Sequence, residues 1–209
     1  MKPFLKWAGG KTQLLPELRK YLPPEFNRYY EPFVGAGAVL FELQPYTAVI
    51  NDVNAELINC YNMIKWFLKM LVMELSGYKN DEDFYYSVRA LDRVRNNFKP
   101  DVESAARTIY LNKTCFNGLY RVNSKGQFNT PYGRYKNEFK PDEETILAVS
   151  KYLNESQVTI LSGDFETTVK DAREGDFVYF DPPYDPVSET ANFTAYNSGG
   201  FSRGDQARL

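Results

Sequence analysis

The chain has 209 residues, of which 43% are apolar, 25% charged and 16% aromatic. This length and composition exclude a disordered chain and are typical of one globular domain, or of a core domain that carries a smaller inserted one. The 25 basic and 27 acidic residues give a net charge of −2, so the average charge does not indicate a nucleic-acid-binding protein. No apolar run is long enough to span a bilayer.

Histidine is absent from the sequence. Its absence excludes Ser-His-Asp triads and removes the commonest general base and the commonest zinc ligand. Cys60 and Cys115 lack the spacing of a metal site, and a chain with two cysteines and no signal peptide is expected to keep reduced thiols in the cytoplasm. We therefore expect a cytoplasmic protein without a metal.

Apolar spacing in the first third of the chain predicts two strands, each followed by a helix. The first strand runs into Gly35-Ala36-Gly37, and the second ends at Asn51-Asp52. A strand, a glycine turn and a helix in this order are typical of parallel α/β sheets. The predicted elements are a helix over residues 11–21, a strand over 29–34, a helix over 38–43, a strand over 47–50 and an amphipathic helix from 55 to about 75.

The pattern changes after residue 81, where two helical segments lead into a region rich in Gly, Asn, Ser and Pro. We predict a β-hairpin over residues 119–135, with its turn at 123–126 between Val122 and Phe128. Parallel-sheet character returns near the end, where an apolar strand runs into Asp181. The predicted elements are helices over 83–94 and 102–113, strands over 157–161 and 176–180, and a mobile polar loop over 185–200. The middle of the chain therefore reads as an insertion into an α/β domain.

Asp181-Pro182-Pro183-Tyr184 follows this last strand, and its residue types suit the activation of an exocyclic amine. The Asp181 carboxylate and the Pro182 carbonyl would accept hydrogen bonds from the amine and stabilise the positive charge that develops during methyl transfer. Consecutive prolines fix the backbone, and Tyr184 would stack on a base swung out of a duplex. The alternative is that Asp-Pro-Pro only ends a strand.

The glycine loop at residues 35–37 would let a cofactor approach the backbone, with Asp52 holding ribose hydroxyls. A dinucleotide-binding site is less favoured, because the third glycine of that fingerprint is replaced by Leu40 and the acidic residue comes too early. Gly10-Lys11-Thr12 lacks the first glycine of a P-loop, since residue 5 is leucine. We therefore exclude a nucleoside triphosphatase.

These motifs together resemble the Dam-type DNA adenine N6-methyltransferases, including the GATC-specific methylases of restriction systems, over nearly the whole chain. The resemblance implies a Rossmann-like S-adenosylmethionine-dependent methyltransferase sheet with an inserted, mainly helical target-recognition domain that carries a β-hairpin. Residues 1–56 and 157–209 would form the catalytic domain and residues 57–156 the inserted one. It also implies a cytoplasmic enzyme of a bacterium or phage that takes its methyl group from S-adenosylmethionine.

Asp52 and Asp181 match cofactor contacts of the family, and two segments resemble its cofactor-binding parts: residues 4–11 and Gly163-Asp164-Phe165. In the last of these, Asp164 would hydrogen-bond the cofactor's adenine, although a short loop with an N-cap aspartate explains the same residues. Together with the glycine loop, the expected cofactor contacts are Trp7, Gly10, Lys11, Phe33, Gly35, Gly37, Asp52, Asp164, Phe165 and Asp181.

Residues 116–121 and 128–136 resemble the family's target-recognition hairpin, which implies duplex DNA with a flipped adenine as substrate and GATC as its site. The stretch from Lys113 to Lys140 holds six basic residues and one acidic residue. Arg121 suits bidentate contact with a guanine edge, while neighbouring Lys and Arg side chains would hold phosphates. The expected DNA contacts are Phe116, Asn117, Leu119, Arg121, Lys125, Pro131, Arg134 and Lys136. The alternatives are that the hairpin only packs and that the charges form a solvated face.

Two other functions remain open at this point. Related tetrapeptides serve amine methyltransferases that act on protein or RNA, and a DNA-binding module that does not catalyse is a further possibility. Family members continue beyond the position of Leu209, so we expect the catalytic sheet of this chain to be incomplete, which bears on its stability and activity. We also expect a monomer, and direct methyl transfer without a covalent protein intermediate.

Overall fold

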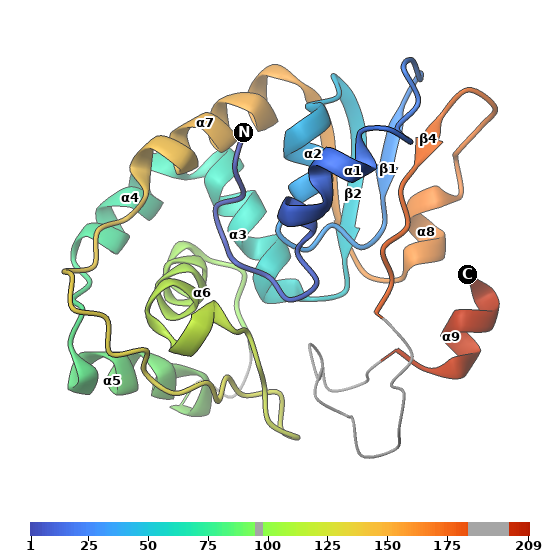
Figure 1. The fold of residues 1–209 in the computed structure, drawn as a ribbon. Coiled ribbons are helices and arrows are strands. Elements are labelled where there is room, and N and C mark those ends of the chain that lie inside the picture. The colour runs from blue at the N-terminus through green and yellow to red at the C-terminus, as the bar shows by residue number, and fades with distance from the viewer. Residues whose placement is uncertain (95–97, 184–200) are drawn as a thin grey trace.

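The computed structural model describes residues 1–94, 98–183 and 201–209 (Figure 1). Tyr184 and the loop predicted over residues 185–200 lie outside the described residues. The centre of the fold is a four-stranded, fully parallel sheet in the order β3-β2-β1-β4. Its strands are β1 (Tyr29–Glu31), β2 (Thr47–Asp52), β3 (Gln157–Ser162) and β4 (Phe177–Val178).

Helices cover both faces of this sheet. The ring of Phe41 on α2 packs against Tyr61 on α3 and Tyr152 on α7, so these three helices share one face. Tyr30 points to the other face, where its hydroxyl donates to the carbonyl of Asp171, just after α8. Figure 1 shows α2, α3 and α7 on one side of the sheet and α8 on the other. The bounds are α2 (Ala38–Leu43), α3 (Ala55–Trp66), α7 (Glu143–Glu155) and α8 (Phe165–Val169).

The strand order creates a switch point between β1 and β4. The chain proceeds from β1 outward through β2 to β3, and then crosses back to place β4 on the other side of β1. In open parallel sheets, ligands bind at the carboxyl ends of the strands beside such a point. The predicted α/β fold class with a Rossmann-like parallel sheet is confirmed.

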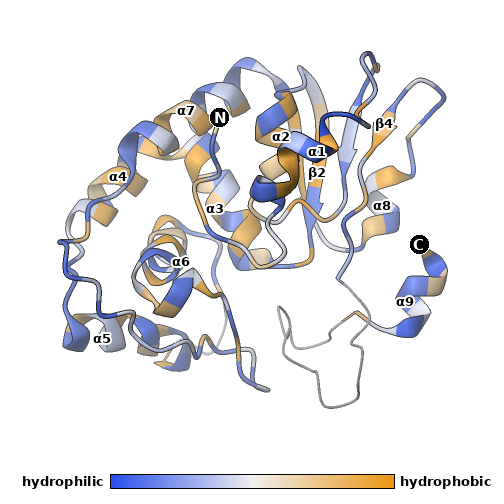
Figure 2. Ribbon diagram, in the orientation of Figure 1, coloured by the Kyte–Doolittle hydropathy of each residue, from blue (hydrophilic) through white to orange (hydrophobic). Residues whose placement is uncertain are grey.

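The middle of the chain is mainly helical, with α6 against α3, α4 and α5. Figure 2 shows apolar residues along α2, α3 and β2, where much of the core lies. The remaining elements are η1 (Lys11–Leu14), α1 (Leu15–Leu18), α4 (Leu68–Ser76), α5 (Glu82–Val94), α6 (Val102–Thr114), η2 (Phe116–Gly118) and α9 (Arg203–Arg208).

The helix predicted from 55 to about 75 is in fact two helices. Phe67 leaves helical geometry, with φ −130° and ψ 32°, and separates α3 from α4. The bend lets Leu71 and Leu75 become fully buried where α4 meets α6 and α7. Tertiary packing thus overrides a continuous apolar pattern.

Other elements are shorter than predicted. The helix expected over residues 11–21 is a short 3₁₀ turn followed by α1, because Pro16 stands in the first turn of α1 and has no N–H for the preceding turn. Strand β1 ends at Glu31 because Pro32 cannot donate to the ladder. Strand β4 ends at Val178, and just after it the Tyr179 amide still donates to the Tyr30 carbonyl of β1. Helix α7 was not predicted, although its N-cap Asp142 accepts from the Thr145 amide.

The predicted hairpin has its turn but not regular strands. The Gly126 amide donates to the Asn123 carbonyl, and Val122 pairs with Phe128 as predicted. Side chains replace much of the remaining ladder: the Thr130 hydroxyl donates to the carbonyl of Leu119. The carbonyls of Phe128 and Thr130 also accept from Arg93, Arg89 and Tyr85 on α5.

Candidate active site

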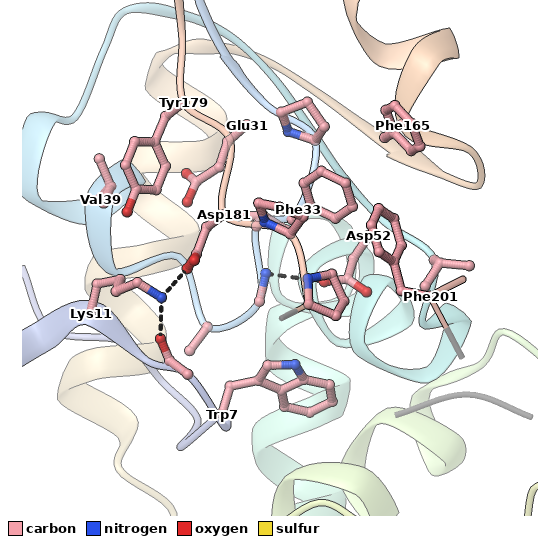
Figure 3. Close-up of a pocket in the computed structure, with 18 of the residues that line it drawn as sticks. Trp7, Lys11, Glu31, Phe33, Val39, Asp52, Phe165, Tyr179, Asp181 and Phe201 are labelled. Carbon is pink, nitrogen blue, oxygen red and sulfur yellow. Dashed lines mark hydrogen bonds and ion pairs between the residues drawn. The ribbon is translucent and has the colours of Figure 1, made fainter. Parts of the chain in front are cut away.

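A cavity of about 470 Å³ lies at the carboxyl ends of the strands, beside the switch point (Figure 3). This volume is within the range of small-molecule and cofactor sites. Its lining combines the N-terminal segment, the loop after β1, the ends of β2, β3 and β4, and residues near α9. The lining residues are 7–11, 31–36, 38, 39, 52, 53, 163–165, 179, 181–183, 201 and 205.

The glycine loop after β1 needs its glycines. Gly35 and Gly37 have φ +50° and +75°, which side chains disfavour. A Cβ on Gly37 would lie 2.6 Å from the hydroxyl oxygen of Tyr61, and one on Gly35 would lie 3.1 Å from Cδ1 of Trp7. The Tyr61 hydroxyl donates to the Gly35 carbonyl at 3.0 Å. Gly35 lines the cavity, so bare backbone faces the cavity there, whereas Gly37, also an expected cofactor contact, lies outside the lining and packs against Tyr61.

Asp52 ends β2 at the same edge. Its Oδ2 accepts from the Gly35 amide at 3.1 Å and its Oδ1 accepts from the Asn54 amide at 2.9 Å. Burial raises the pKa of Asp52 to about 6, while the two amides oppose that rise. The carboxylate thereby joins the glycine loop to the start of α3.

Lys11 and Asp181 form an ion pair within the cavity, as Figure 3 shows. Their side chains are only 12% and 20% exposed, and the Lys11 ammonium also donates to the Gly9 carbonyl at 2.8 Å. The structure thus joins two residues that the sequence placed 170 positions apart. Pro182 and Pro183 line the cavity next to them.

Glu31, at the end of β1, is a cavity residue that the sequence analysis missed. Its side chain is buried, with 3% exposure, and accepts a hydrogen bond of 2.8 Å from the Tyr29 hydroxyl. Burial raises the pKa of Glu31 to about 8. A carboxylate at the carboxyl end of an otherwise aromatic strand was the available signal.

Aromatic rings form one wall of the cavity. The Phe33 ring lies 5.5 Å from that of Phe165 and 5.6 Å from that of Phe201, measured between centroids. Figure 3 shows these three rings together, away from Lys11 and Asp181. This wall suits a flat, apolar group of a ligand.

Asp164 lines the cavity next to Phe165 of the aromatic wall and is the N-cap of α8. Its Oδ1 accepts from the Glu166 amide at 3.0 Å, and both its oxygens accept from Arg208 at 2.8 Å. The bonds from Arg208 and from that amide lower the pKa of Asp164. The N-cap geometry considered for this residue is therefore present.

Four of the expected DNA contacts lie in η2 or beside it. Phe116 and Leu119 are 54% and 42% exposed, and Asn117 and Pro131 are also exposed. The Phe116 amide donates to the Pro131 carbonyl at 2.9 Å, which joins the two halves of the hairpin region. Large apolar side chains on the surface mark candidate contact sites.

The basic residues of the hairpin region lie farther along it. Arg121 Nε donates to Asn129 Oδ1 at 2.7 Å, while Lys125 and Lys136 are exposed. Arg134 is also exposed, with φ +53°, and makes a long ion pair of 3.9 Å with Glu82. All eight expected DNA contacts thus belong to this region and lie outside the cavity lining.

Two general findings apply to the described ranges, 1–94, 98–183 and 201–209. They contain no helix that is long and apolar enough to cross a membrane. They also contain no group of three or more His, Cys, Asp or Glu side chains arranged to hold a metal.

Comparison with known proteins identifies relatives over the whole chain. It is 52% identical to the type II methyltransferase M1.LlaDCHI of Lactococcus lactis, covering all of this chain and 75% of the relative. It is 46% identical to the type II methyltransferase M.MjaIII of Methanocaldococcus jannaschii, covering 78% of that protein, and 38% identical to the DNA adenine methylase of Serratia marcescens, covering 76%. Residues 7–209 match the family model of the D12 class N6 adenine-specific DNA methyltransferases, and the chain belongs to that family.

Proposed function

We propose that this protein transfers the methyl group of S-adenosylmethionine to N6 of adenine within GATC in duplex DNA. The observation that carries the proposal is that one cavity is lined by Gly35 and Ala36 of the glycine loop, by Asp52, and by Asp181-Pro182-Pro183. A cofactor-type loop and an amine-activating motif therefore meet at one edge of the sheet. Family membership supports the adenine substrate.

The cavity residues fit S-adenosylmethionine in chemical type. The backbone left bare by Gly35 permits close approach, and the Asp52 carboxylate suits ribose hydroxyls. The aromatic wall around Phe33 suits the adenine ring of the cofactor, and the Lys11 ammonium suits the cofactor's carboxylate. When bound, this cofactor supplies a methyl group on a positively charged sulfur.

Activation of the target amine is assigned to Asp181 and to the Pro182 carbonyl. Lys11 engages Asp181 through Oδ2, so we assign Oδ1 to the amine. Bound S-adenosylmethionine would supply its methyl group to the amine nitrogen and keep the electron pair of the broken carbon–sulfur bond, while Asp181 and the Pro182 carbonyl would hold the amine. The nitrogen then releases one proton to solvent, and both acceptors stabilise the positive charge before that release.

The target adenine must leave the duplex for this step, because its amine is otherwise paired. We assign stacking on the flipped base to Tyr184. The surface cluster at Phe116 and Leu119 would contact the DNA, and Arg121 would read a guanine edge. Asn129 would orient Arg121 through their 2.7 Å hydrogen bond.

We propose that residues 57–156 are the target-recognition part, although α3 packs on β2 and β3 as well as on α6. We also propose that the protein acts as a monomer. Light scattering with and without DNA tests that state.

Digestion of plasmid from expressing cells tests both activity and site. We expect resistance to a nuclease that cuts only unmethylated GATC and sensitivity to one that cuts only methylated GATC. The Asp181→Ala variant should lose methyl transfer by about 10²-fold or more, because the amine loses its charged acceptor, while duplex binding persists. Retained activity in this variant would overturn the assignment of Asp181.

A second assay separates the alternative substrates and functions. Tritiated methyl counts from labelled S-adenosylmethionine should enter GATC duplex and not RNA or total protein. Counts in RNA or protein alone would support the other amine methyltransferases. Calorimetry that shows DNA binding without S-adenosylmethionine binding would instead favour a module that does not catalyse.

A further inference from the structure

The N-terminal segment that enters the cavity is held by a side chain from the helical part of the molecule. Asn112, near the end of α6, is fully buried. Its Oδ1 accepts from the Lys6 amide at 2.9 Å, and its Nδ2 donates to the Lys6 carbonyl at 2.7 Å. One side-chain amide thus binds both backbone groups of the residue before Trp7, as a neighbouring strand would.

The same side chain also binds the surface loop that carries the expected DNA contacts. Asn112 Nδ2 donates to the Gly118 carbonyl at 3.1 Å, between the exposed residues Asn117 and Leu119. A Cβ on Gly118 would lie 2.6 Å from Cδ of Lys6, so the two segments are in direct contact. The planar amide allows all three bonds only when both segments keep one relative position.

A ring contact forms a second connection between these segments. Trp7, which lines the cavity, stacks on Tyr120 with centroids 4.7 Å apart and planes at 29°. Tyr120 is 5% exposed and stands between Leu119 and Arg121, two expected base contacts. Movement of the loop therefore moves a ring that packs against the cavity wall.

We propose that Asn112 is a positioning residue that, together with the Trp7–Tyr120 stack, couples binding in the cavity to recognition of the DNA site. The inference rests on the proposed function, because it takes the cavity as the S-adenosylmethionine site and the loop as the base-contact site. When the loop binds its DNA site, the Lys6 backbone and Trp7 become fixed in position. The cofactor then binds to a cavity wall that is already in place. By linkage, bound cofactor favours the site-bound form of the loop to the same degree.

The measured quantity is the ratio of two dissociation constants for S-adenosylmethionine, one without DNA and one with a GATC duplex. Calorimetry gives both, and a duplex with an altered site gives the nonspecific reference. For the wild type we expect a GATC-dependent tightening of about 5-fold or more, the usual range for coupled sites. A substitution that only destabilises the fold would raise both dissociation constants and leave their ratio unchanged.

Two variants break the connection at different points. Asn112→Asp keeps the shape and the acceptor for the Lys6 amide but loses the donors to the carbonyls of Lys6 and Gly118. Its control is Asn59→Asp, since Asn59 is also buried on a helix but donates to the carbonyl of Asp101. Tyr120→Leu removes the stack, and Tyr120→Phe keeps the ring as its control.

We expect the ratio to fall toward 1 in Asn112→Asp and Tyr120→Leu, and to stay at the wild-type value in both controls. An unchanged ratio in Tyr120→Leu would overturn the inference, and this variant decides alone where Asn112→Asp does not fold. A wild-type ratio of 1 with measurable cofactor binding would overturn the coupling while leaving the proposed function intact. A wild type that binds no S-adenosylmethionine would overturn both.

Discussion

At the scale of single residues, Glu31 is the group whose ionisation the fold opposes most clearly within the cavity. It accepts from the Tyr29 hydroxyl in a site with 3% exposure, and its carboxyl has a pKa of about 8 because burial disfavours the charge. An acid whose pKa rises on folding binds more protons in the folded state between the two values. Its contribution to stability is complete below the unfolded value of about 4.3 and is lost as pH rises through 8.

Glu31→Gln should therefore flatten the dependence of stability on pH. In the wild type, Glu31 should lower the free energy of unfolding by up to about 1.4 kcal/mol per pH unit between pH 5.5 and 7.5. The amide does not titrate, so this part of the slope should vanish in the variant. Urea unfolding at three pH values measures the slope, and an identical slope in both proteins would contradict the assignment of the pKa.

Two glycines with similar backbone angles allow a matched test of the cavity loop. Gly37 and Gly126 have φ +75° and +74°, but a Cβ on Gly37 would lie 2.6 Å from the Tyr61 hydroxyl, whereas one on Gly126 meets nothing within 4 Å. Gly126→Ala should cost about 1 kcal/mol of strain, and Gly37→Ala about 1–3 kcal/mol more. Gly37→Ala should also weaken cofactor binding, because its Cβ would displace the Tyr61 hydroxyl that donates to the carbonyl of the cavity residue Gly35. Urea unfolding and calorimetry measure both effects. Equal costs would show that the contact with Tyr61 is unimportant.

At the scale of elements, the hairpin region owes its shape to α5 as much as to its own pairing. Asp92 on α5 accepts from the Phe128 amide at 2.8 Å and from the buried Arg107 of α6 at 2.6 Å. Arg93 donates to the carbonyl of the same Phe128 at 2.8 Å. One carboxylate thus connects two helices and the loop that carries the expected DNA contacts.

Asp92→Ala should be strongly destabilising, because it leaves the Arg107 guanidinium buried without its nearest partner. We expect a loss of about 3 kcal/mol in the free energy of unfolding and a higher KM for DNA. Glu17→Ala is the control, since both side chains of the Glu17–Lys20 ion pair are exposed. The pair should contribute less than about 1 kcal/mol to the free energy of unfolding. Urea unfolding and steady-state kinetics test both, and similar losses in the two variants would refute the role of Asp92.

Element type was predictable where local pattern decides it. Helix α2 has the predicted bounds, and the turn at Asn123 was read from local residue types. The break at Phe67 and the missing hairpin ladder were not predictable, because both depend on partners far away in the chain. The same holds for the site: Lys11 and Asp181 were both expected there, but their ion pair joins positions 170 apart, and the burial of Glu31 is likewise set by distant elements.

At the scale of the whole molecule, charge is distributed unevenly around a nearly neutral average. The net charge is −2, yet the stretch from Lys113 to Lys140 has six basic residues and one acidic residue. Each phosphate contact made by such residues releases counterions, so DNA affinity falls as salt rises. The average charge of the sequence hides this surface.

Salt dependence should separate phosphate contacts from base contacts. The double change Lys125→Gln and Lys136→Gln should reduce the slope of log K against log salt by about 2 for any duplex sequence. Arg121→Ala should instead lose about 1–3 kcal/mol of discrimination against an altered site. Lys151→Gln, on the outer side of α7, is the control and should leave both unchanged. Fluorescence anisotropy of labelled duplexes measures these quantities, and equal losses on all sequences for Arg121→Ala would exclude a base contact.

The placement of Trp7 also makes the protein its own optical reporter. The chain contains two tryptophans: Trp7 lies in the cavity wall on Tyr120, while Trp66 is 63% exposed at the end of α3. Trp66 does not line the cavity, so Trp66→Phe would remove its emission without touching the cavity. The remaining indole would then follow the filling and emptying of the cavity in real time, in unlabelled protein and during turnover.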